Sequence, residues 1–540
     1  MNSMSGFHFR AARSRGLRRR ARPAVEARRL ALAAFAALAL PCAARAEAVP
    51  AAISRQFDTA AESGPRALLD DLARVLAANP SLVATPGAAA ALARAAASPV
   101  PDFVGANLPV YREIEARIVS AAPAPVRDAV RRAVDRELSG YAATDIRIMP
   151  PLPAMGPANL RRQPPEIGPA GYKVGDYTIY PSIQAGTFYD DNIYATRTGR
   201  VADAVGTISP VIAIQSNWKR NALYAEVGAD LTGYWTHGNE NTADWHAQVE
   251  GRIDVNAKTR VVLGGIVLHE HEDRSSPDAV EGLTPTPYTE MNAYAGVIRR
   301  VGTFSIRTGA AVERLTFGNV EGLHGEINNQ DRDRNRYTFG ILARDDARPG
   351  FRPYAELLGD LRRYDTVPDD FQYFRNSDGF RAGVGALFRL LPSLSGDAFV
   401  GVMHRDYADS RFKTITTPAG SADLRWQAGE DTALTLFIDR SIEETTLPGS
   451  PAYIYTLVGG RIEHAITDDL TGIARAAFAR SDFAQSTRWD NEADMSVGLR
   501  YRLVSRVFLG VDYRYTQRIS SDSIFNFRRN QLYVELTEEF

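Results

Sequence analysis

Two short runs of the sequence hold residue types that could bind a metal ion. In residues 269–273, which read His-Glu-His-Glu-Asp, two histidines stand two positions apart. On a β-strand His269 and His271 would point to the same side, which makes a two-histidine cation site geometrically feasible. The acidic run 190–192 (Asp-Asp-Asn) could similarly bind calcium. Charged residues are common where a strand enters a loop, and a short acidic turn often caps itself, so we predict no metal site and no cofactor.

Residues for covalent catalysis are present but are not arranged for it. Serine, histidine and aspartate all occur, yet the sequence contains no nucleophile elbow, no zinc-protease helix and no phosphate-binding loop. The single cysteine, Cys42, falls in a leader that we expect to be removed, which excludes disulfides and thiol chemistry from the mature chain. We therefore expect no catalytic residue and no enzyme.

A third set consists of charged residues at every second position of long segments in the C-terminal two thirds of the chain. In a wide β-barrel they would face a polar lumen and form a constriction that selects anionic or sugar-rich solutes. Alternatively, they pair across neighbouring strands and hold the wall together. Arg500, Arg502 and Arg514 are expected to lie near one another, because they fall on adjacent segments. The candidate lumen residues are Asp230, Glu250, Arg252, Asp254, Arg381, Arg389, Asp423, Arg425, Arg500, Arg502, Asp512 and Arg514.

The segments that would position these charges alternate between apolar and polar residues from about Tyr177 onward. Val511 and Asp512, for example, fall on opposite faces of one segment. A soluble β-sandwich shows the same alternation, so the alternation alone does not decide between the two folds. The segments are commonly about 10 to 15 residues long, whereas soluble strands cluster near about 5 or 6 and tilted membrane strands need about 9 to 11. Their length favours a membrane barrel.

Short and long connections also alternate along the chain, as periplasmic turns and extracellular loops do in outer-membrane barrels. The short connections are Lys219–Asn221, Asn256–Lys258, Arg300–Gly302, Leu391–Ser393, Gly429–Asp431, Thr467–Asp469 and Val504–Arg506. The longer ones are Asp273–Pro285, Gly318–Asp333, Tyr364–Tyr373, Asp409–Pro418 and Glu443–Pro451.

These patterns predict an all-β transmembrane antiparallel β-barrel of about 18 strands, preceded by a small α-helical periplasmic segment. An even strand number brings both ends of the barrel to the periplasmic side. A wall of about 18 strands is wide enough to leave an aqueous channel.

The first predicted strand, Tyr180–Gly186, and the Tyr189–Tyr194 turn after it resemble the opening of the outer-membrane β-barrel porin-2 family of proteobacteria. The resemblance covers roughly residues 175 to 540. It implies an outer-membrane barrel, and some relatives are associated with exopolysaccharide export. The chain ends on a strand that resembles the signal read by the barrel-assembly machinery, although Glu538 stands where an apolar residue is usual; its residues are Leu532, Val534, Leu536 and Phe540.

The N-terminal third of the chain has a different pattern. Residues 1–46 read as a signal peptide, with an arginine-rich start, an apolar stretch from Leu30 to Leu40, and Ala44 and Ala46 at the cleavage site. A twin-arginine signal at Arg28-Arg29 and lipidation at Cys42 fit less well. Residues 47–146 are expected to form short amphipathic helices in the periplasm, and 147–171 a proline-rich linker before the barrel at 172–540.

The sequence therefore predicts an outer-membrane pore for hydrophilic solutes in a Gram-negative cell. Two alternatives remain open: the exit channel of an exopolysaccharide export system, with the helical segment as a docking module or plug, and a structural or surface-interaction barrel. Expected partners are outer-membrane lipid, lipopolysaccharide, the barrel-assembly machinery and a periplasmic partner of the helices. The leader holds ten Arg and one acidic residue, so the rest of the chain has a net charge of −10, which argues against nucleic-acid binding. The sequence does not indicate an oligomeric state.

Overall fold

The computed structural model describes residues 49–62, 65–97, 107–127, part of 129–138, and 171–540 with the exception of 219–220, 281, 349, 392, 430, 505 and 540. The predicted signal peptide, with Ala44 and Ala46, lies outside these residues. So do nearly all of the proline-rich linker and Phe540 of the assembly signal.

The N-terminal segment forms short helices around a hydrophobic core of its own. The helices are α2 (Ala51–Glu62), α3 (Pro65–Ala78), α4 (Pro86–Ala97) and α5 (Asn107–Ala121), with the 3-10 turns η1 (Pro80–Val83) and η3 (Ala124–Val126). Leu68, Leu72, Leu92 and Ile114 are fully buried in this core. Helix α2 falls within the segment expected to be helical, although Ile53 and Phe57 are its only large apolar residues. None of the helices in the described residues is long and apolar enough to cross a membrane.

The C-terminal segment is a closed antiparallel barrel of 18 long strands, which confirms the predicted fold class. Each strand pairs with the next along the chain, and the last strand pairs with the first, so the sheet has no free edge. The strands are β2 (Tyr177–Asp190), β3 (Asp203–Ser216), β4 (Ala222–Tyr234), β5 (Thr242–Asn256), β6 (Thr259–His271), β7 (Pro287–Val301), β8 (Phe304–Phe317), β11 (Arg334–Asp345), β12 (Phe351–Tyr364), β13 (Ser377–Leu391), β14 (Leu394–Tyr407), β15 (Ile415–Gln427), β16 (Thr432–Glu443), β17 (Tyr453–Ala465), β18 (Leu470–Phe483), β19 (Trp489–Val504), β20 (Val507–Ser520) and β21 (Phe527–Glu539).

Three short strands complete the sheet structure. Strand β1 (Tyr172–Val174) folds back on the start of β2. Strands β9 (Val320–Gly322) and β10 (Gly325–Ile327) form a small hairpin within the loop that joins β8 to β11.

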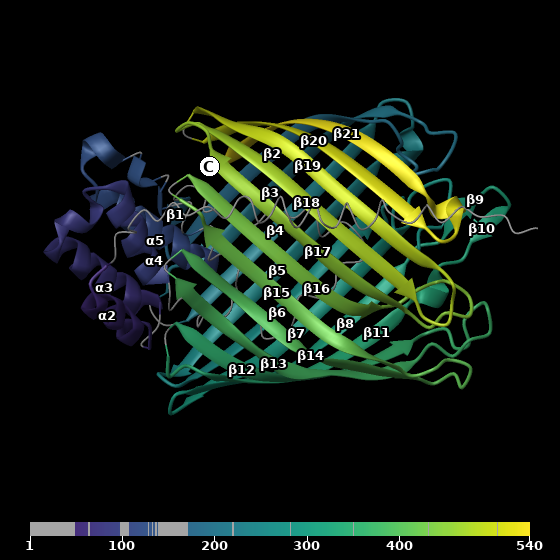
Figure 1. The fold of residues 1–540 in the computed structure, drawn as a ribbon, viewed down its shortest axis with the longest axis horizontal. Helices are drawn as coiled ribbons and strands as arrows, with labels where there is room; N and C mark the ends of the chain where they lie inside the picture. Colours follow the sequence, from purple (N-terminus) through teal and green to yellow (C-terminus); the bar gives the residue numbers. More distant parts are fainter. Residues whose placement is uncertain are drawn as a thin grey trace, which may run out of the picture. The chain divides into compact units, whose positions relative to one another are not determined.

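The strands lie oblique to the barrel axis, with short turns at one end and longer loops at the other (Figure 1). One predicted boundary is wrong: the loop expected to run to Pro418 ends earlier, because β15 begins at Ile415. Pro418 lies near the start of β15, before the pairing of β15 with β16 begins at Gly420, so its missing N–H is tolerated. The turn that joins β11 to β12, with Asp346, Arg348 and Gly350, was not among the predicted connections.

Side-chain exposure alternates along each strand, as expected for a wall with an apolar outer face. Val249, Val497 and Val511 are 47%, 58% and 41% exposed, although they are aliphatic. Their neighbours on either side are polar, charged or glycine and lie on the inner face. The exposed apolar side chains form the surface that a lipid bilayer would cover.

Candidate functional site: the lumen and its inward loop

The inner face of the wall carries charges of both signs. It is the face opposite the exposed apolar side chains of each strand, and the structure places there the residues singled out from the sequence. These are Asp230 on β4; Glu250, Arg252 and Asp254 on β5; Arg381 and Arg389 on β13; Asp423 and Arg425 on β15; Arg500 and Arg502 on β19; and Asp512 and Arg514 on β20.

Several of these charges pair with neighbours in the wall. Arg252 Nε lies 3.2 Å from an Asp254 carboxylate oxygen, and Arg260 Nε lies 3.4 Å from the same oxygen. Arg514 Nε donates to Asp494 at 2.7 Å. Because opposite charges on neighbouring strands stabilise a sheet, these residues hold the wall together as well as lining the lumen.

Arg500 and Arg502 lie together over the Phe508 ring, at 4.0 Å and 6.0 Å from its centre, but Arg514 does not join them, which corrects part of the sequence expectation. Arg500 lies opposite Gly510, four residues from Arg514 along β20. At about 3.3 Å per residue this separation is about 13 Å. Adjacent strands were identified, but their register was not readable from the sequence.

One long loop reaches across the barrel. Residues 272–286 join β6 to β7, the fifth and sixth strands of the wall, yet they bond to groups on the far side. The Asp278 carboxylate accepts a hydrogen bond from the Thr445 hydroxyl at 2.7 Å, in the loop between the thirteenth and fourteenth strands. Arg488, between β18 and β19, donates to the Pro277 carbonyl at 3.0 Å. We call residues 272–286 the cross-lumen loop.

Arginines of the inner wall anchor the same loop on another side. Arg518 on β20 donates to the Ser275 carbonyl, and Arg529 Nη1 on β21 lies 3.6 Å from the Asp273 carboxylate. Ser275 is only 1% exposed, and both anchoring arginines lie near the strand ends that carry the long loops. The cross-lumen loop is therefore fixed at several points around this mouth of the barrel.

Other long loops are bonded to one another. Arg375, in the loop after β12, pairs with Asp369 at 2.6 Å. Its Nη1 donates to the carbonyls of Thr445 at 2.9 Å and Ser450 at 3.2 Å, both in the loop after β16. This buried arginine therefore joins two loops that the sequence separates by four strands, β13 to β16.

Glu444 joins the loop after β16 to the wall. Its carboxylate accepts hydrogen bonds from Arg362 and from the Tyr364 hydroxyl. Burial alone would raise its pKa, but the attraction of Arg362, Arg405 and Arg334 outweighs it and lowers the pKa of Glu444 from 4.5 to about 2. The lowered pKa favours the charged carboxylate.

The two runs considered for metal binding have other partners. His269 shares a hydrogen bond with the Thr289 hydroxyl at 3.0 Å, and His271 pairs with Asp244 at 2.7 Å. In the 190–192 turn, the first carboxylate accepts the amide N–H of the third residue at 2.8 Å, so the turn caps itself. Among the described residues no group of three or more His, Cys, Asp or Glu side chains could hold a metal ion.

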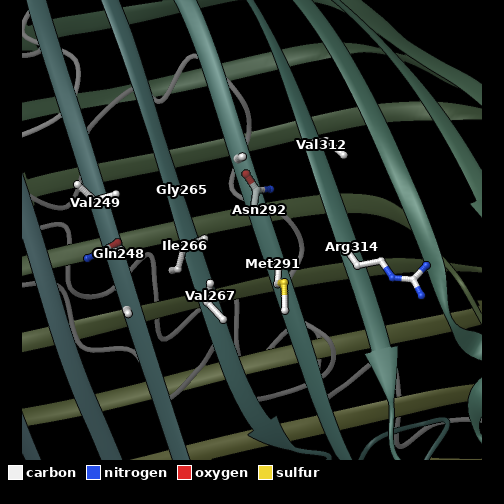
Figure 2. Close-up of a pocket in the computed structure, with 11 residues that line it drawn as sticks. Gln248, Val249, Gly265, Ile266, Val267, Met291, Asn292, Val312 and Arg314 are labelled. Carbon is white, nitrogen blue, oxygen red and sulfur yellow. The ribbon is translucent and has the colours of Figure 1, made fainter.

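One hollow of the wall lies among outer-face side chains (Figure 2). It has a volume of about 530 Å³ and crosses β5 to β8. Ala247, Gly265 and Ala293 leave it open because their side chains are small. Exposed apolar side chains surround it: Val249, Val267, Met291 and Val312. This hollow belongs to the lipid-facing surface.

The anchors of the cross-lumen loop were missed by sequence reasoning. Arg488, Arg518 and Arg529 are three of many arginines in the C-terminal segments, and their partners in the loop are backbone carbonyls or one aspartate. Every residue has a backbone carbonyl, so the sequence does not show which carbonyl accepts a hydrogen bond. The one available signal was the length of the loop, with prolines at 277, 285 and 287.

The closed wall, with its apolar outer face and charged inner face, defines a transmembrane β-barrel. Residues 164–540 match the family model described as "Putative beta-barrel porin 2", and the chain belongs to this family. This confirms the resemblance seen in the sequence and places the protein in the outer membrane. Fold and family are those of a channel rather than an enzyme. No curated protein matches the chain.

Solved structures of outer-membrane porins are similar to this chain at low sequence identity. OccAB3 of Acinetobacter baumannii is 11% identical, covers 68% of this chain and 100% of its own, and gives a TM-score of 0.39. OccK2 (OpdF) of Pseudomonas aeruginosa is 12% identical, with 67% and 98% covered and a TM-score of 0.39. A BenF-like porin of Pseudomonas fluorescens Pf-5 is 9% identical, with 68% and 100% covered and a TM-score of 0.40.

Proposed function

We propose that the protein is a pore for small hydrophilic solutes, narrowed by the cross-lumen loop. The observation that carries the proposal is the inner face, which is charged and polar along a closed wall of 18 strands. A barrel of this strand number has room for an aqueous channel, and a loop fixed at several points around its mouth sets the size of solute that passes. The two alternative functions have no supporting observation in the described residues.

Single-channel conductance in planar bilayers tests the pore. We expect steady open current from the wild-type protein. Asp278→Ala removes the bond to Thr445 and should raise the unitary conductance or add rapid fluctuations, because the cross-lumen loop loses one anchor. The matched control is Asp522→Ala, which removes a loop carboxylate that bonds to Ile524 and not to the cross-lumen loop. Absence of current from correctly folded wild-type protein would refute the pore.

We also infer that the N-terminal helices lie in the periplasm. The first barrel strand, β2, begins at the end of the barrel that carries the short turns, and outer-membrane barrels keep their short turns on the periplasmic side. Conductance of refolded residues 172–540, measured beside the chain that includes the helices, tests their role. Equal currents would make the helices an appendage, whereas current only after their removal would make them a plug.

A further inference from the structure

A continuous row of hydrogen-bond donors crosses nine neighbouring strands on the inner face of the barrel. Each member is the direct register partner of the next, from β13 to β21, and each side chain can donate a hydrogen bond. We call this set the donor row. Its members are Arg389, Ser395, Arg425, Thr435, Arg461, Arg475, Ser496, Arg514 and Gln531.

The donor row runs along the pore as well as around it. Arg389 is the third-last residue of β13, close to a short turn, whereas Arg514 is the eighth residue of β20. Gln531 pairs with Asp190, the last residue of β2, at the end that carries the long loops. Because the strands of a closed barrel are tilted and staggered, a line of register partners climbs from one mouth toward the other. A solute moving through the lumen would pass along it.

Two arginines stand side by side at the centre of the row. Arg461 on β17 and Arg475 on β18 are direct partners, and these strands lie next to each other in the wall (Figure 1). Side chains directly opposite in an antiparallel pair have Cβ atoms about 5 Å apart, and like charges there destabilise the sheet. Thr435 and Ser496 are their partners on the outer sides of the pair, so no carboxylate separates the two guanidinium groups along the row.

The hydrogen-bonding capacity of this pair is only partly used. Arg461 pairs with Glu463 through Nη2, while its Nε and Nη1 are buried without a hydrogen-bond partner. Arg475 is half-buried, and in the part of the chain that the structure describes no carboxylate lies within ion-pair distance of it. Asp512 and Glu463 attract it electrostatically from beyond that distance. A planar guanidinium with free N–H groups suits bidentate binding of an oxyanion.

We propose that Arg461 and Arg475, flanked by Thr435 and Ser496, form a binding step for an oxyanion, the carboxylate or phosphate group of a small solute. An anion beside the two guanidinium groups would relieve their repulsion. The carboxylates of Glu463 and Asp512 beside the site would keep the affinity modest, as passage through a channel requires. The inference rests on the proposed function, because it assumes that solutes enter the lumen.

Titration calorimetry on the full-length protein in detergent tests the binding step, with citrate and inorganic phosphate as separate probes. We expect the wild type to bind at least one of them, and the variant R461Q/R475Q to bind it at least ten-fold more weakly. The matched control is R352Q, which removes an inner-face arginine of β12 outside the donor row and should leave the affinity within about two-fold of wild type. Which probe binds assigns the carboxylate or the phosphate class.

The proposal is overturned if the wild type binds neither probe, or if R461Q/R475Q binds as tightly as wild type. If the double variant does not assemble, the single variant R475Q replaces it, with an expected weakening of at least three-fold. Conductance separates this test from that of the pore. A protein that conducts but binds neither anion refutes the binding step alone, whereas one that binds an anion without conducting refutes the pore.

Discussion

An arginine placed on the outer face of β20 should destabilise the barrel far more than the same arginine one position earlier. Val511 is the middle residue of the outer-face stretch Val507–Tyr515 and is 41% exposed, with Val534 as its partner on β21. An arginine at the middle of the lipid layer costs about 2–4 kcal/mol, against about 0–1 kcal/mol near the interfaces. Val511→Arg should therefore lower the free energy of unfolding by about 2–4 kcal/mol.

Gly510→Arg is the matched control, because residue 510 lies on the inner face. A Cβ added there would meet no atom closer than 3.9 Å, and Glu535, its partner on β21, offsets the charge of Arg500, its partner on β19. We expect a loss under about 1 kcal/mol for this variant. Urea unfolding in phospholipid vesicles, followed by tryptophan fluorescence, measures both losses. Equal losses would refute the assignment of the two faces.

Three further predictions concern the loops and the wall. Since the folded-state pKa of Glu444 is lowered to about 2 from 4.5, its stabilising contribution should be complete above pH 4.5 and disappear as the pH falls toward 2. Protease sensitivity of the loop after β16 should rise over this range, and Glu444→Gln should remove the pH dependence. Arg375→Ala leaves Asp369 buried without its partner, a change that typically costs about 3–5 kcal/mol, and should expose the loop after β12 to proteolysis at neutral pH; unchanged cleavage would contradict the loop-joining role. Gly401→Ala would bring a Cβ within 2.2 Å of the Ala382 carbonyl, whereas Gly359→Ala meets nothing within 4 Å. Heat-modified mobility on gels should therefore show slower assembly for the former, and equal rates would argue against close strand contact.

The alternation of residue types, the length of the segments and the alternation of short and long connections were together enough to predict the barrel, its strand count and the apolar outer face. A period of two assigns Val511 and Asp512 to opposite faces before any partner is known. Register is different, because it depends on the stagger of the whole closed sheet. For this reason the expected grouping of Arg500 with Arg514 was wrong, and the pairing of Arg461 with Arg475 could not be seen. The cross-lumen loop was equally hidden, since its anchors bind backbone carbonyls of residues with no periodic pattern.

The pairing of β21 with β2 constrains the order in which the protein can fold. Gln531 donates to Asp190 at 2.7 Å across 341 residues of chain. Hairpins between successive strands join residues close in sequence and can form early, whereas this seam brings together the two most distant strands and carries the largest loop-closure entropy. Until it forms, the growing sheet has two open edges whose unpaired N–H and C=O groups cannot be left in hydrocarbon. Pairing of β21 with β2 should therefore be the slow, cooperative step of insertion. Until these strands pair, the cell must protect both open edges of the sheet.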